Sequence, residues 1–393
     1  MYYLFIFLLL LVLSVIHVFG RWNRYSDLFI YSMLFIIFWF TAGLRYETGI
    51  DWLTYTENFE RTNPINIVFS SGFGKGMFLE PSYGLICSCV KYFGGSIQSV
   101  FFIMAFISTC FLFKSIFLYS YNKVFSLLIY FCFVYLMLDM SGMRHAVAEN
   151  IFFYSIQFIQ KRKLIQYLLF IALAISFHLS AIILLPVYFI VNKLISTKVM
   201  CFTVGLGLLV FLFNIKFIGF LSDILLSIFN DGVIGSKIIT YTTVPSLVKT
   251  RPFSLEMLIY LVFFITLSLF RKKISLDEKF SNIFINLIWI HLLLCFYLFE
   301  LYDVSVRLAI FFIIGYVVLL PNLSHQVNLK TNKLIIAMVV CLFSFLPKRG
   351  IFLEAKDGLP YNPYQNYWYY KMFDKESTGK ERLDHYYKSI KKK

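Results

Sequence analysis

Long apolar runs recur along nearly the whole chain, and this pattern constrains the fold more than any other feature. An α-helix needs about 20 apolar residues to cross the ~30 Å hydrocarbon core of a bilayer. Only 15% of the 393 residues are charged, against about 25% in a soluble domain, and the mean hydropathy is +0.76. The sequence therefore predicts an all-α polytopic membrane protein.

Candidate spans lie at 1–20, 27–44, 79–93, 97–118, 124–140, 144–160, 164–177, 180–195, 199–218, 255–270, 281–299, 304–320 and 333–346. Some are marginal in length, and we expect 11 to 13 transmembrane helices. They predict one transmembrane domain over 1–346, with outer loops at 45–78 and 219–254. A tail at 347–393, aromatic and then basic, follows it.

The net charge of +15 arises from 36 basic and 21 acidic residues. On a membrane protein such an excess usually marks cytoplasmic loops that face anionic lipid. Nucleic-acid binding is disfavoured, because no soluble basic domain is present to carry it. Basic loops at 21–24, 161–163, 193–198 and 271–273 place Arg144 and His178 at the outer face. Lys114 and Lys123 also favour the cytoplasmic side of the membrane. This placement requires either a short or re-entrant segment at 79–93 or an inverted orientation of the first two spans.

The segment 164–195 is too long for one span. As a single helix it would measure roughly 45 Å at 1.5 Å per residue. Two short helices that meet near His178 fit the charge pattern better and would line a cavity, where irregular backbone is tolerated.

Ionisable side chains at membrane depth are costly, so they indicate a functional site by default. Arg144 and His145 open one apolar run, and His178 with Ser180 interrupts another. Contact with an anionic substrate is one interpretation of Arg144, and snorkelling to the interface is the other. For His178 the alternative to a catalytic base is a hydrogen-bonded core histidine.

The first outer loop combines a cation, a glycine turn, a carboxylate and aromatic residues: Arg45, Gly49, Asp51, Trp52 and Tyr55. The planar guanidinium of an arginine suits phosphate and keeps its charge at any working pH. Asp51 could be a catalytic base or accept a hydrogen bond from a substrate hydroxyl, or it could be a loop cap. Trp52 and Tyr55 could stack on a sugar or anchor the chain at the interface.

Three further residues lie at expected membrane edges. Glu80 precedes Pro81, where a helix start accounts for both residue types, yet the edge position also admits a catalytic role. Arg307 could bind pyrophosphate or simply open a helix. Tyr361, in the aromatic tail, could roof a cavity or belong to an interfacial belt.

Neither a metal nor a cofactor is expected. The seven cysteines all lie within apolar runs and show no ligand spacing. The sequence contains no phosphate-binding glycine loop, nucleophile elbow or HExxH motif.

Four ordered pieces resemble the Wzy/EpsG family of bacterial polysaccharide polymerases. Residues 44–55 (LRYETGIDWLTY) are similar to the family's RYGTGTDYxxY loop, and 80–86 (EPSYGLI) to EPGYxLL. Residues 142–156 (GMRHAVAENIFFYSI) are similar to GIRQxIAxxIFLYSI, and 176–189 (SFHLSAIILLPVYF) contain the FHxSAxxxLP segment. Residues 306–312 and 359–364 match later features more loosely. In this chain Glu47 replaces glycine, Ile50 and Trp52 flank Asp51 in place of threonine and tyrosine, and His145 replaces glutamine.

The resemblance implies a multi-pass protein of the bacterial inner membrane with a fold akin to the C-type membrane glycosyltransferases. It implies polymerisation of undecaprenyl-diphosphate-linked oligosaccharide repeats at the periplasmic face, for O-antigen, capsule or exopolysaccharide. Membrane lipid and a chain-length regulator protein are the other expected partners.

In this hypothesis Arg45, Arg144 and Arg307, with His145, Tyr55, Trp52, Ser180 and Tyr361, bind substrate and its pyrophosphate, and Asp51, Glu80 or His178 acts as base. Two alternatives stay open. A flippase or exporter of the same lipid-linked sugars would also use buried cations, although the inverted repeats typical of transporters are not found. A glycan ligase is the second.

Overall fold

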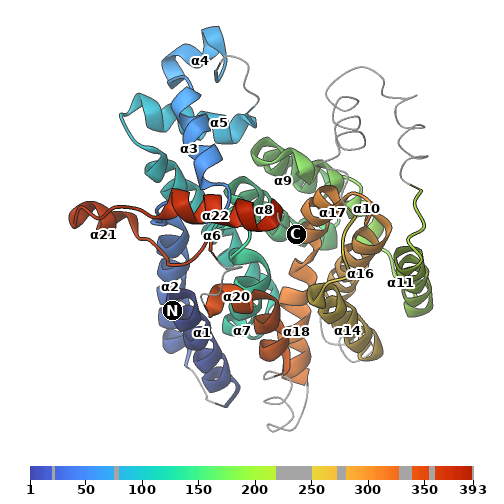
Figure 1. Cartoon of the computed structure of the whole chain (residues 1–393). Coiled ribbons are helices and arrows are strands. Elements are labelled where there is room, and N and C mark those ends of the chain that lie inside the picture. Colours follow the sequence, from blue (N-terminus) through green and yellow to red (C-terminus); the bar gives the residue numbers. More distant parts are fainter. Residues whose placement is uncertain are drawn as a thin grey trace. The chain divides into compact units, whose positions relative to one another are not determined.

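The computed structural model of the protein describes residues 1–19, 23–74, 79–217, 250–271, 280–326, 339–353 and 359–391. Helices make up the regular structure of these residues (Figure 1), which divide into two compact units. The first comprises Met1–Leu185 and Leu320–Lys393, and the second comprises Pro186–Leu319. The expected tail is therefore part of the first unit. Most of the expected outer loop at 219–254 lies outside the described residues.

Every regular element in the described residues is helical, which confirms the predicted all-α class; one isolated bridge pairs Arg45 with Asn366. The helices of the first unit are α1 (Tyr2–Phe19), α2 (Arg24–Gly43), α3 (Trp52–Arg61), α4 (Ile65–Ser71), α5 (Pro81–Tyr92), α6 (Ile97–Tyr119), α7 (Lys123–Tyr130), the π-helix η1 (Phe131–Tyr135), α8 (Met143–Gln160), α9 (Leu164–Phe177), the 3₁₀-helix η2 (Leu179–Leu184), η4 (Leu346–Lys348), α20 (Arg349–Phe352), α21 (Tyr367–Met372) and α22 (Gly379–Lys391).

The second unit contains α10 (Val187–Val191), α11 (Thr197–Leu212), α14 (Leu255–Leu269), α16 (Ser281–Tyr297), α17 (Tyr302–Ala309) and η3 (Ile310–Phe312). Helix α18 (Ile314–Gln326) runs from this unit into the first. Within the second unit α16 packs against α11, α14 and α17. Its His291 is buried beside Tyr260 and Tyr316.

Two described helices, α2 and α6, are long and apolar enough to cross a membrane. A third span is possible if Tyr302–Phe312 and Ile314–Leu323, bent by 42°, count as one. Shorter apolar helices of 10–17 residues are Tyr2–His17, Lys123–Tyr135, Leu164–Phe177, Leu179–Val191, Thr197–Leu212, Leu255–Leu269 and Ser281–Tyr297. The expected total of 11 to 13 spans stays a prediction.

The core of the first unit is formed around α6, which packs against α2 and α8. Two side chains of α2 tie it to the α6 backbone: Tyr31 donates to the carbonyl of Phe113 (2.6 Å) and Trp39 to that of Phe102 (3.1 Å). Helix α7 is almost entirely buried, as expected for a helix that is apolar on all sides.

The chain breaks at His178, as the length argument predicts. Helix α9 ends at Phe177, and His178 adopts an extended conformation (φ −153°, ψ 116°) before η2 begins. The predicted short segment at 79–93 is also observed, because α5 has only 12 residues.

Candidate functional site

Glu80 is the centre of a charged cluster in the first unit. It precedes α5, but its side chain does not cap that helix. Instead, Arg144 at the start of α8 donates a short hydrogen bond from one terminal guanidinium nitrogen to Glu80 Oε2. His178 Nδ1 lies 3.6 Å from the other carboxylate oxygen. One carboxylate therefore joins three segments that are far apart in sequence.

The two histidines of the cluster lie together. The rings of His145 and His178 stack with centroids 4.6 Å apart. His145 is 6% exposed, whereas the side chain of His178 is 17% exposed and that of Arg144 22% exposed. Solvent or a ligand can thus reach Arg144 and His178, while the buried His145 ring stacks against the His178 ring.

Aromatic rings form the wall beneath Arg144. The guanidinium carbon lies 5.4 Å from the ring centre of Tyr55 and 5.3 Å from that of Tyr83, and both tyrosines are buried. Cation–π contacts of this kind hold a guanidinium in a fixed orientation. Tyr55, a predicted substrate contact, therefore touches Arg144.

Asp51 is brought to the same region by a loop that binds the turn before α8. The backbone amides of Ile50 and Asp51 donate to Ser141 Oγ at 3.0 and 3.3 Å. Asp51 stands at the start of α3 without capping it through its side chain. Its Oδ2 lies 4.0 Å from the place that a Cβ on Gly142 would occupy. Asp51 therefore lies beside the turn that precedes α8, and its alternative roles stay predictions.

The C-terminal tail packs on this loop. Tyr46 and Gly49 donate backbone hydrogen bonds to the carbonyls of Gln365 (2.8 Å) and Pro360 (2.7 Å). Arg382 of α22 donates to the carbonyls of Pro363 and Glu47. Tyr361 is buried. The tail therefore covers residues 46–49, and both alternatives for Tyr361, a roof over a cavity and an interfacial belt, stay predictions.

Arg45 has a different environment from Arg144. It is 1% exposed, and one terminal nitrogen donates to the carbonyls of Ala42 (2.7 Å) and Asp139 (3.0 Å). Its guanidinium carbon lies 4.4 Å from the ring centre of Phe101. In this structure Arg45 binds backbone in the core, so the predicted contact with pyrophosphate would require it to move.

The remaining predicted residues are distributed as follows. Trp52 is buried at the first turn of α3, where its ring supports the helix. Ser180, in η2, has a buried hydroxyl with no hydrogen-bond partner among the described residues. Arg307 is exposed on α17 of the second unit.

The electrostatics of Glu80 favour its ionised form. It precedes α5, outside the helices long enough to span a membrane. Burial alone raises the pKa of this carboxyl, but the His178 ring and the Arg144 charge outweigh burial and lower the pKa to about 2. A carboxylate with so low a pKa is a weak proton acceptor. Glu80 is therefore suited to orient Arg144 and His178 rather than to act as base.

Two parts of the cluster were missed in the sequence. Tyr83 is fully buried against Arg144, and Ser82 Oγ lies 2.6 Å from Ser176 Oγ, which links the start of α5 to the end of α9. Their proximity to Glu80 in the sequence was the available signal. No group of three or more His, Cys, Asp or Glu side chains in the described part of the chain could hold a metal ion.

Comparison with known protein families gives a match to the EpsG family over residues 28–367, well over half of the 393 residues. Neither the curated proteins nor the solved structures gave a match. The fold and the family together define a helical membrane protein of polysaccharide biosynthesis. The chain belongs to the EpsG family, which indicates a glycosyltransferase-like polymerase.

Proposed function

We propose that the protein polymerises undecaprenyl-diphosphate-linked oligosaccharide repeats at the periplasmic face of the bacterial inner membrane. The growing glycan is transferred from its lipid diphosphate to a hydroxyl of a second lipid-linked repeat. The observation that carries the proposal is the Glu80 cluster, in which Arg144 and His178 both meet one carboxylate and both remain partly exposed.

Arg144 is the proposed diphosphate ligand. A guanidinium offers several donors in one plane, and only part of this donor set is used by Glu80. The tyrosine rings beneath it fix its direction. A preorganised cation of this kind stabilises the negative charge that develops on the leaving diphosphate.

His178 is the proposed base. The acceptor hydroxyl attacks the anomeric carbon, and its proton passes to the imidazole. A new glycosidic C–O bond forms while the bond from the anomeric carbon to the diphosphate oxygen breaks. Undecaprenyl diphosphate leaves with the bonding electron pair. A neutral imidazole needs little pKa adjustment for this work near pH 7. Asp51 is the second candidate for the acceptor hydroxyl.

The test uses purified protein with a lipid-linked repeat as the sole substrate. Wild type should yield long-chain product, and Arg144→Ala should yield only single-repeat lipid, since one charge-stabilising donor contributes about 10²–10³-fold in rate. Arg24→Ala removes an exposed arginine from the start of α2 and serves as the control, with unchanged chain length expected. An unaltered chain-length distribution in Arg144→Ala would refute the role.

The same assay distinguishes the alternatives. A flippase would move the lipid-linked repeat across a vesicle membrane without lengthening it. A ligase would require a separate lipid acceptor before any glycan is transferred. Polymer from a single substrate in detergent excludes both as the main activity.

A further inference from the structure

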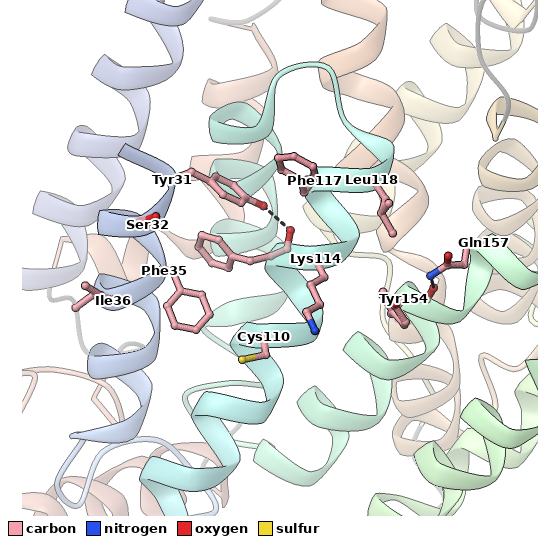
Figure 2. Close-up of a pocket in the computed structure, with 11 residues that line it drawn as sticks. Tyr31, Ser32, Phe35, Ile36, Cys110, Lys114, Phe117, Leu118, Tyr154 and Gln157 are labelled. Atoms are coloured by element: carbon pink, nitrogen blue, oxygen red, sulfur yellow. Dashed lines mark hydrogen bonds between the residues drawn. The ribbon is translucent and has the colours of Figure 1, made fainter. Parts of the chain in front are cut away.

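A groove lies against α6 in the first unit (Figure 2), and none of its lining residues belongs to the Glu80 cluster. It has a volume of about 620 Å³ and is lined by side chains of α2, α6 and α8, a volume within the usual range for ligand sites. Phe35 and Tyr31 of α2, Phe117 of α6 and Tyr154 of α8 make it mainly apolar. Both α2 and α6 are long and apolar enough to cross a membrane, so we expect lipid around this groove.

One cation lies within the groove. Lys114 projects from α6 between the aromatic residues of α2 and the Tyr154 side of α8 (Figure 2). It is exposed and lies five residues before the end of α6, or about 7.5 Å along the axis. In Figure 2 the amine points toward Cys110, and a long lysine side chain can also extend toward the nearby end of the helix, where lipid headgroups would lie. Lys114 also lies 13 residues after Phe101, the α6 residue that contacts Arg45. The two positions are therefore about 20 Å apart along the helix axis.

Two further lysines stand at the rim. Lys161 donates to Gln157 Oε1 (3.0 Å), and Gln157 lines the groove. The Lys123 amine lies 4.6 Å from the ring centre of Phe117, another lining residue. No acidic residue lines the groove, and none of the three lysines forms a salt bridge within the described residues. The charge of the rim is therefore uncompensated by protein.

We propose that this groove binds one anionic phospholipid of the surrounding bilayer, with its phosphate on Lys114 and its acyl chains along the α2 and α8 aromatic residues. Charge complementarity selects the occupant, because an apolar groove with a cationic rim matches an apolar tail with an anionic head. The positive-inside pattern puts this end of α6 in the cytoplasmic leaflet, where anionic lipids are concentrated. The site is separate from the proposed glycan-transfer site.

The experiment measures lipid binding without any glycan substrate, so its outcome does not depend on polymerase activity. Purified full-length protein in detergent is titrated with phosphatidylglycerol or with phosphatidylcholine of the same acyl chains. Native mass spectrometry then gives the dissociation constant of the first bound lipid. Wild type should bind phosphatidylglycerol at least about tenfold more tightly, the effect of one charge-assisted contact. Lys114→Gln should abolish that preference, and Lys114→Arg should retain it.

Two variants sharpen the result. Lys388→Gln removes an exposed lysine of α22 and should change nothing. Cys110→Phe fills part of the groove and should weaken both lipids alike. Circular dichroism and elution volume establish that each variant is folded.

Equal affinities of wild type for the two lipids would overturn the proposal, as would an unchanged preference in Lys114→Gln. Displacement of phosphatidylglycerol by excess inorganic phosphate would indicate a simple anion site instead. Tighter, Lys114-dependent binding of a long-chain polyprenyl phosphate would assign the groove to the carrier lipid, and this too would contradict a phospholipid site.

Discussion

Two arginines of the first unit, Arg45 and Arg144, have the same chemistry and opposite environments. Arg45 is 1% exposed and donates to two backbone carbonyls. Arg144 is 22% exposed and is paired with a carboxylate that also meets a histidine. Both had been predicted to hold pyrophosphate.

The difference shows what makes a cation available for chemistry. One terminal nitrogen of Arg45 donates to backbone groups that cannot leave, while its Nε and its other terminal nitrogen have no hydrogen-bond partner among the described residues. Removal of the side chain would leave two buried carbonyls without this donor. Arg144 is bound to one side chain, Glu80, that can share it with an incoming anion. Burial and the identity of the hydrogen-bond partner, not residue type, separate a structural arginine from one suited to substrate.

The largest expected effect tests whether Arg45 stabilises the fold. Arg45→Met should lower the free energy of unfolding by about 3 kcal/mol, because the carbonyls of Ala42 and Asp139 lose their donor in the core. Arg144→Met should cost less than Arg45→Met, because Arg144 is partly exposed and the Glu80 carboxylate keeps its contact with His178. Unfolding in mixed micelles measures both. Similar losses of unfolding free energy in the two variants would contradict the distinction between a structural arginine and one suited to substrate.

Much of the candidate site could be predicted from the sequence. Helix-start positions and the break near His178 identified Glu80, Arg144, His145 and His178, because ionisable groups at such places are costly without a purpose. The all-helical class followed from the length of the apolar runs.

The rest depends on contacts between distant segments. His145 and Glu149 have the four-residue spacing that brings side chains together on a helix, whereas the structure stacks His145 on His178, 33 positions further on. Glu149 itself is buried, and neither of its carboxylate oxygens has a hydrogen-bond partner in the described part of the chain. Nothing local in the sequence shows that Arg45 turns inward, because that orientation is fixed by Asp139, 94 positions away. For Arg307, pyrophosphate binding stays a prediction.

The next prediction tests whether Glu80 positions Arg144 and His178. Glu80→Gln should slow polymerisation by about a hundredfold through misplacement of Arg144 and His178, and it should also remove the stability that the ionised carboxylate contributes at neutral pH. Because the pKa of Glu80 is about 2, its ionisation should not shape the rate between pH 5 and 8. Its contribution to stability is complete above the ordinary value of 4.5 and is lost only as the pH falls toward 2. A pH–rate profile and a thermal melt of wild type and Glu80→Gln measure these effects.

A wild-type acid limb near pH 5 that disappears in Glu80→Gln would contradict the positioning role and make Glu80 a titrating catalytic group. Glu80→Asp keeps the charge on a shorter side chain and should recover only part of the rate. Full recovery would show that charge alone, without exact placement, is sufficient.

The smallest effect concerns Gly49, which connects the core around Arg45 to the Asp51 loop. Its φ of +100° disfavours other residues, and a Cβ there would lie 2.2 Å from the carbonyl oxygen of Met140. Gly49→Ala should therefore cost about 2 kcal/mol and displace Asp51 from Ser141, which lowers polymer yield as well as the melting temperature. Gly72→Ala is the matched control, because Gly72 also has a positive φ (+68°) but no atom lies within 4 Å of its added Cβ. If the two variants lose equal stability, backbone strain alone is responsible, and the close contact with Met140 does not couple the Arg45 core to the Asp51 loop.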